Sequence, residues 1–94
     1  MLHPVDYVNT IFGLELTADQ VVMARVALNV LFDPDQYPVD ISEVMTLRSK
    51  NRILVRGFLA WCAFEPEHYQ SLSEELCQRL RRAVIDPAAA ETWR

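Results

Sequence analysis

Three arginines at four-residue spacing are the residues of this chain best suited to chemistry with a partner. Arg48, Arg52 and Arg56 lie in the apolar segment 46–61, TLRSKNRILVRGFLAW, which contains no acidic residue. Residues four apart share one face of a helix, so the three guanidinium groups would form a stripe without a local carboxylate. Guanidinium groups pair with carboxylates and phosphates, and the stripe is therefore a candidate binding surface.

The charge distribution leaves three uses for this stripe. Residues 1–46 carry seven acidic residues against one base, Arg25, whereas residues 47–94 carry eight bases against six acids. We expect first that the stripe pairs with the acidic half of the same chain or stays solvated. An acidic surface of another protein comes next, followed by a phosphate-bearing partner. Arg79 differs from the stripe, because Glu75 lies one turn before it and can pair with it locally.

A nucleic-acid interface is the alternative class of function. The segment 41–59 has the rhythm of a helix-turn-helix, although Ile53, Leu54 and Val55 stand where base-reading polar side chains are expected. Phosphate contacts would come from the basic segment, and a small anionic ligand near Ser49 is a further alternative. The nucleic-acid-binding candidates are Arg48, Lys50, Asn51, Arg52 and Arg56.

Residue types suited to catalysis or metal binding are scarce. His3 and His68 are the two histidines, and the spacing of His68 with Cys62 and Glu65 matches no strong zinc pattern. Cys62 lies in the apolar run AWCAF and is expected to pack in the core rather than act as a nucleophile. A glycine-rich phosphate loop is absent from this sequence, which has two glycines. We therefore predict a protein that is not an enzyme and needs no metal or cofactor.

Helical periodicity dominates the elements that must position the stripe. No segment alternates polar and apolar residues over five positions, as a strand would. The pattern predicts an all-α fold: one domain over residues 1–94, built as a compact bundle of four to five short helices. The expected helices are 4–12, 18–32, 41–64 as two helices or one kinked helix, 66–85, and a short helix from Asp86.

Polar residues at fixed spacing mark where these helices begin and end. Thr17 with Gln20, and Asp40 with Glu43, have the three-residue spacing of capping boxes. Gly13 predicts the end of the first helix.

The helix expected over 18–32 is apolar almost all round. Arg25 and Asn29 form its only polar stripe, and Val22 and Phe32 fall on or beside that stripe. Such a helix is either central to a core or covered by a second chain. Because a small domain buries a whole helix with difficulty, this pattern predicts a homodimer or an obligate complex.

Aromatic residues after the stripe have two interpretations. Phe58, Trp61 and Phe64 recur every three residues, which favours core packing. Tryptophan and arginine are also enriched at interface hot spots, so Phe58 and Trp61 could form a binding patch with Arg56. Tyr37, in a loop rich in aspartate and proline, is expected to be exposed.

The sequence therefore predicts a small cytoplasmic regulator or adaptor that binds another protein. The net charge of −4 disfavours general nucleic-acid binding, and no secretory signal or membrane-spanning run is visible. The predicted mechanism is inhibition or regulation by occlusion: an apolar helix face and an Arg/Trp patch cover a working surface of the partner. The candidate contact residues are Val22, Arg25, Phe32, Arg48, Arg52 and Arg56.

Overall fold

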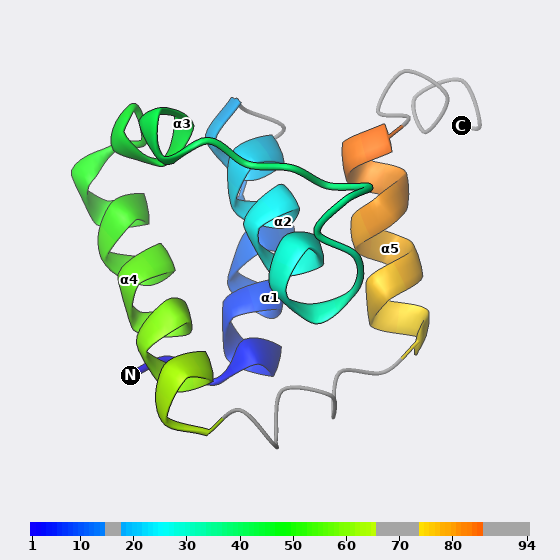
Figure 1. The fold of residues 1–94 in the computed structure, drawn as a ribbon, viewed down its shortest axis with the longest axis horizontal. Coiled ribbons are helices and arrows are strands. Elements are labelled where there is room, and N and C mark those ends of the chain that lie inside the picture. The colour runs from blue at the N-terminus through cyan, green and yellow to red at the C-terminus, as the bar shows by residue number, and fades with distance from the viewer. Residues whose placement is uncertain (15–17, 66–73, 86–94) are drawn as a thin grey trace.

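All regular structure in the described part of the chain is helical. The computed structural model describes residues 1–14, 18–65 and 74–85, and it contains no strand there (Figure 1). The all-α prediction is confirmed, and the five helices of the described residues lie within the predicted range. In chain order the helices are α1 (Pro4–Phe12), α2 (Ala18–Leu31), α3 (Ile41–Met45), α4 (Ser49–Phe64) and α5 (Glu74–Ile85).

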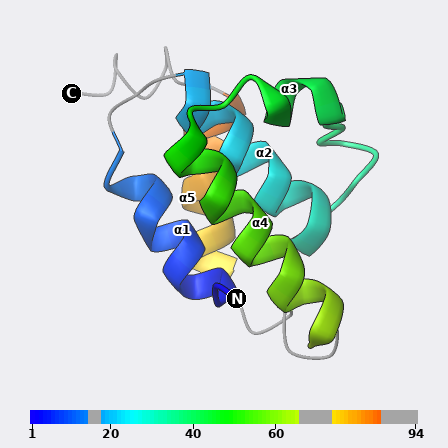
Figure 2. The ribbon, with the colours of Figure 1, turned by 90° about the vertical axis from the view of Figure 1, so that its left-hand side faces the viewer.

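Helix α2 runs through the middle of the bundle. It contacts each of the other four helices, with α4 on one side and α5 on the other (Figures 1 and 2). This central position accounts for its apolar composition without a second chain. The expectation of an oligomer, which depended on surplus apolar surface on this helix, loses that support. Buried side chains on α2 are Gln20, Met23, Ala24, Val26, Ala27 and Leu28.

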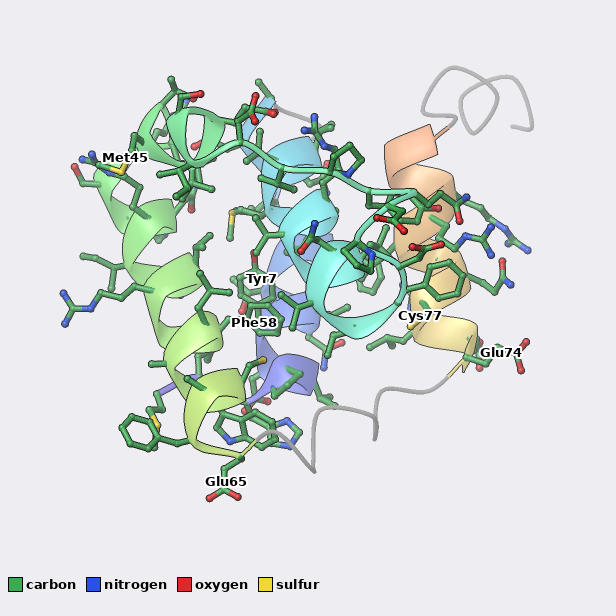
Figure 3. The ribbon with its side chains drawn as sticks, viewed as in Figure 1. Tyr7, Met45, Phe58, Glu65, Glu74 and Cys77 are labelled. Carbon is green, nitrogen blue, oxygen red and sulfur yellow. The ribbon has the colours of Figure 1, made fainter. Side chains whose placement is uncertain are left out.

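A stacked aromatic pair joins α1 to α4 at the centre of the core. The rings of Tyr7 and Phe58 lie nearly parallel, with centroids 4.3 Å apart (Figure 3). The Tyr7 hydroxyl donates a hydrogen bond of 2.8 Å to the backbone oxygen of Met23 in α2. Burial raises the pKa of Tyr7 far above its ordinary value, so this hydroxyl stays protonated. The pair thus fixes three helices relative to one another.

The first residues of the chain lie against the middle of α4. The Leu2 N–H donates to the Gly57 oxygen at 2.9 Å. A Cβ atom at Gly57 would approach Leu2 Cβ to 3.2 Å, so a larger residue there would displace the N-terminal segment. This close approach explains a glycine inside a helix, where it otherwise costs stability.

Residues 41–64 form two helices, as favoured from the sequence. Asp40 is the N-cap of α3, and its N–H donates to Glu43 Oε1 at 3.3 Å, as the capping-box spacing predicted. Helix α3 ends at Met45, and α4 begins at Ser49 after a short turn. The first helix ends at Phe12 with Gly13 following it, also as predicted.

Gln20 shows a tertiary role that its sequence position does not indicate. Its side-chain Nε2 donates to the backbone oxygens of Ile11 at 2.9 Å and Leu14 at 3.1 Å, beside the end of α1. It therefore ties α2 to the end of α1. Thr17, its predicted capping partner, lies outside the described residues.

Helix α5 docks through arginines that stack on aromatic rings. The Arg79 guanidinium lies 4.1 Å from the centre of the Phe12 ring, and no ion pair with Glu75 forms in the described structure. The predicted local pairing of Arg79 is therefore wrong, and cation–π packing replaces it. The side chain of Leu80, on the same helix, is fully buried in the core. The expected start of this helix at residue 66 and the helix from Asp86 fall outside the described residues.

Tyr37 is buried, which corrects the expectation that it is exposed. Its hydroxyl accepts a hydrogen bond of 3.0 Å from Arg81 Nε, and its backbone oxygen accepts one of 2.9 Å from Asn29. The sequence pattern correctly indicates a loop here, but this loop packs between α2 and α5.

Candidate functional site

The arginine stripe lies on the outside of the bundle. Arg48 is the residue before α4 and is exposed, as is Arg56, while Arg52 is partly buried. Arg52 donates to the backbone oxygen of Met45 at 3.5 Å and to Ser49 Oγ at 3.1 Å. None of the three forms an ion pair with a carboxylate of residues 1–14, 18–65 or 74–85. Direct ion pairing of the stripe with the acidic half is therefore not found in this part of the molecule, although the charge of Arg48 acts on Asp19. The other expected state, a solvated stripe, agrees with the exposure of Arg48 and Arg56.

Glu43, an acid of the N-terminal half close to the stripe, is already paired with a different arginine. Arg25 on α2 reaches Glu43 at 2.7 Å and also donates to the Pro38 oxygen at 3.1 Å. This ion pair, together with the hydrogen bond from Asp40, holds the pKa of Glu43 below its usual value. Arg25 thus fastens α3 to α2 and is not a free cation for a partner.

A carboxylate from α2 occupies the N-terminus of α4. Asp19 Oδ2 accepts hydrogen bonds from Asn51 Nδ2 at 2.8 Å and from the Arg48 N–H at 3.1 Å. These two bonds, and secondarily the charge of Arg48, lower the pKa of Asp19. A helix N-terminus attracts anions, and here Asp19 already supplies one.

The position of Asp19 argues against two predicted phosphate contacts, the one through Asn51 and the one at the turn near Ser49. Asn51 is 6 % exposed, and its amide is bound to Asp19, so it is not placed to contact a base or phosphate. The turn near Ser49, proposed for a small anionic ligand, faces the same carboxylate. Asn51 is therefore corrected from a candidate contact residue to a structural one, while Lys50 remains exposed.

The predicted partner-binding residues do not form one surface. Val22 is partly buried and packs against the core, and Arg25 is held by Glu43. Phe32 follows α2 and faces α5, where the Arg81 guanidinium stacks 4.8 Å from its ring centre. Arg48, Arg52 and Arg56 are the members of the set that stay together at the outer edge.

Trp61 is also separated from the arginines. Its ring packs edge-on against His3, with centroids 4.9 Å apart. Trp61 follows Arg56 by five positions, which rotates its side chain by about 140° around the helix. Phe58 is buried in the core. The predicted Arg/Trp patch is therefore not one patch, and core packing is confirmed for Phe58 and Trp61. For Phe64, which is 74 % exposed, the expectation of core packing is wrong.

Exposed apolar residues beside the arginines are the feature that sequence reasoning missed. Ile41 is 80 % exposed, Met45 59 % and Leu59 41 %. Arg52, Arg56 and Leu59 follow i, i+4, i+7 spacing and so share one flank of α4. Met45 lies where α3 meets α4 (Figure 3). We call the surface formed by Ile41, Met45, Arg52, Arg56 and Leu59 the α3–α4 face.

An apolar groove adjoins this face. It has a volume of about 150 Å³ and lies between α2, α3 and α4. Ile41 and Leu59 belong both to the groove and to the α3–α4 face. The lining residues are Val26, Asn29, Val30, Val39, Asp40, Ile41, Val44 and Leu59. The only feature of the sequence that could have indicated this groove is the number of valines on α2 and around α3.

The described residues offer little to a catalytic mechanism. Burial raises the pKa values of the Cys62 and Cys77 thiols, which disfavours the nucleophilic thiolate. Within the described ranges, no group of three potential metal ligands occurs. No helix there is long and apolar enough to cross a bilayer.

The lowered pKa values of Asp19 and Glu43 predict acid sensitivity. Stabilisation by these carboxylates is present above their unfolded pKa values and is lost as pH falls through the lower folded values. We expect the melting temperature to fall steeply below about pH 4. In an Asp19→Asn/Glu43→Gln variant the fall should be shallower, since neither group can be protonated.

Thermal unfolding followed by circular dichroism across acidic pH checks this prediction. Asp35→Asn is the control, because Asp35 is exposed and its side chain has no hydrogen bond to described residues. An equal acid response in the double variant and in wild type would contradict the assignment.

Comparison of the chain with protein-family models, curated proteins and solved structures gives no match.

Proposed function

We propose that this chain is a small, non-enzymatic regulator or adaptor that binds a partner protein through the α3–α4 face. Binding would cover a working surface of the partner. One observation carries the proposal: exposed Ile41, Met45 and Leu59 share a surface with Arg52 and Arg56, which have no described carboxylate partner. Isolated exposed apolar residues are ordinary, whereas apolar residues grouped with arginine are typical of interfaces.

A protein partner fits this surface better than nucleic acid does. The chain has a net charge of −4, and Asn51 and the α4 N-terminus are engaged by Asp19. Helix α3 has five residues, and Ile53 on α4 is exposed where a recognition helix would carry a polar side chain. The arginines could still contact phosphates, so the experiment below includes a nuclease arm.

The proposal does not depend on self-association or on location. Because α2 is covered by its own chain, no second copy is needed to bury it, and a homodimer relevant to the proposal would be one that uses the α3–α4 face. Light scattering during size-exclusion chromatography would reveal such a dimer, and charge reversal on the face would dissociate it. We place the activity in the cytoplasm as part of the proposal, since both cysteines are free thiols.

Capture from host lysate tests the proposed function. The tagged chain is compared with Arg52→Glu/Arg56→Glu and with the control Lys50→Glu/Arg82→Glu, which makes the same charge change at exposed positions outside the face. We expect a discrete protein to be retained by wild type and control, lost in the face variant, and unaffected by nuclease. All variants must first show the wild-type circular dichroism spectrum.

Two outcomes would overturn the proposal. Loss of the captured protein on nuclease treatment, or recovery of nucleic acid in its place, would assign the arginines to phosphate binding. Equal loss in the face variant and the control would show that net charge, and not this surface, governs capture.

A further inference from the structure

The groove beside the arginines indicates what kind of partner segment would bind, and this inference rests on the proposed function. Its volume is about 150 Å³, and its lining is mainly aliphatic. Small-molecule sites usually have roughly 300–1,000 Å³, so the groove is small for a drug-sized ligand. An aliphatic cavity of roughly this size holds a group about as large as benzene. It therefore matches a single large apolar side chain.

We propose that the groove receives one large apolar side chain from an acidic amphipathic helix of the partner, and that carboxylates of this helix pair with Arg52 and Arg56. A helix is suited to this task because residues three and four apart lie on one side. An apolar residue and two carboxylates spaced by a turn would face Leu59 and the two arginines, which have the same spacing on α4. Helix-in-groove binding of this kind uses a few apolar anchors along one face.

The charges around the groove favour one arrangement of this helix. On the α4 side, Arg52 and Arg56 lie one helical turn apart and lack described carboxylate partners. On the α3 side, Asp40 is exposed, while Glu43 is neutralised by Arg25. The acidic residues of the partner would therefore lie along α4, away from Asp40, where opposite charges also speed association.

The groove distinguishes an acidic helix from two other anionic partners, a phosphate polymer and an anionic membrane. A phosphate polymer would pair with the arginines but leave the aliphatic groove empty. An anionic membrane would attract the arginines and the exposed Ile41 and Met45, but it would also engage exposed apolar residues outside the groove, such as Ile53. Ile53 does not line the groove and so distinguishes these possibilities.

Selection from a displayed library of short helical peptides tests the inference while the partner itself is still unidentified. Peptides are selected on the full wild-type chain and then measured by fluorescence anisotropy against three single-site or double variants. Leu59→Asp changes the groove, Ile53→Asp is its matched control on the same helix, and Arg52→Glu/Arg56→Glu reverses the charges. Each variant is checked for folding before use.

We expect enriched peptides to carry one large apolar residue with Asp or Glu one turn away. Leu59→Asp should weaken their binding about tenfold or more, as loss of a central interface contact does, whereas Ile53→Asp should change it less than about twofold. The Arg52→Glu/Arg56→Glu variant should prefer versions of the same peptides with Lys in place of Asp and Glu. Such a reversal of preference requires direct charge pairing and not only loss of stability.

Four outcomes would overturn the inference. Selected peptides without acidic residues would remove the arginine pairing, and equal weakening by Ile53→Asp and Leu59→Asp would remove the groove. Binding of phosphatidylserine vesicles or single-stranded DNA in preference to the selected peptides would assign the surface to another partner class. Lysate capture that depends on the arginines but not on Leu59 would leave the proposed function intact while rejecting the acidic helix as its ligand.

Discussion

Phe58→Ala is expected to lower the free energy of unfolding by about 3–5 kcal/mol. Phe58 is 0 % exposed, and its ring stacks on Tyr7 at 4.3 Å. Removing it leaves a cavity between α1 and α4 and takes away the support of the ring that anchors α1 to Met23. A domain of this length has a total stability of roughly 5–14 kcal/mol, so this loss is a large fraction of it.

Urea unfolding followed by circular dichroism measures this loss. Phe64→Ala is the matched control, because Phe64 lies on the same helix but is 74 % exposed. It should change the free energy of unfolding by less than about 0.5 kcal/mol. Similar losses in the two variants would show that Phe58 is not the central contact between α1 and α4.

Asp19→Ala is expected to cost about 1–3 kcal/mol, because it leaves the buried Asn51 amide and the Arg48 N–H without their acceptor. We expect the lower part of this range, since Asp19 is itself only partly buried and water can replace some of the lost bonding. The substitution also removes a negative charge from the N-terminus of α4, where it is favourable. Loss of these hydrogen bonds should weaken the contact between α2 and the beginning of α4 and so disturb the turn between α3 and α4.

A double-mutant cycle separates the pair from general effects. Asp19→Ala and Asn51→Ala should each destabilise, and the double variant should lose less than the sum of the two. Asp35→Ala, at an exposed acidic residue, is the control and should be nearly neutral. Strict additivity of the two losses would mean that the Asp19–Asn51 bond contributes nothing to stability.

These two predictions connect the core to the candidate surface. The aromatic pair holds α4 against α1, and Asp19 holds the beginning of α4 against α2. Arg52, Arg56 and Leu59 lie on α4, so both contacts fix the direction in which the α3–α4 face points. Variants of the face itself should remain folded, because Arg56 and Leu59 are exposed and Arg52 makes only local hydrogen bonds.

Local chemistry made the helices predictable. Helical periodicity, the Asp40–Glu43 spacing and Gly13 indicated the class of fold and several boundaries, and the structure agrees. The break between α3 and α4 was also favoured from the sequence, and α4 begins at Ser49 with Arg48 as its N-cap. These features depend on residues within one or two helical turns of each other, so the order of residues along the chain is sufficient to show them.

The identity of the candidate surface could not be predicted in the same way. The charge pattern marked Arg48, Arg52 and Arg56, and the apolar composition of the helix over 18–32 added Val22, Arg25 and Phe32 to the same predicted surface. Arg25 meets Glu43 and Phe32 meets Arg81 only because distant segments are brought together. The apolar residues Ile41 and Leu59 are separated in sequence and share a groove only in the folded chain.

By itself, the sequence determined an all-helical chain with an acidic first half, no catalytic or metal-binding pattern, and a basic stripe on one helix. Only the tertiary structure decided which charges are neutralised, which aromatics are buried, and which apolar side chains border the arginines. Periodicity assigns each residue to a side of its own helix, but pairing and burial depend on which helices pack together. In this chain, the central position of α2 and the docking of α3 beside α4 leave Arg52 and Arg56 without a described carboxylate, next to an aliphatic groove.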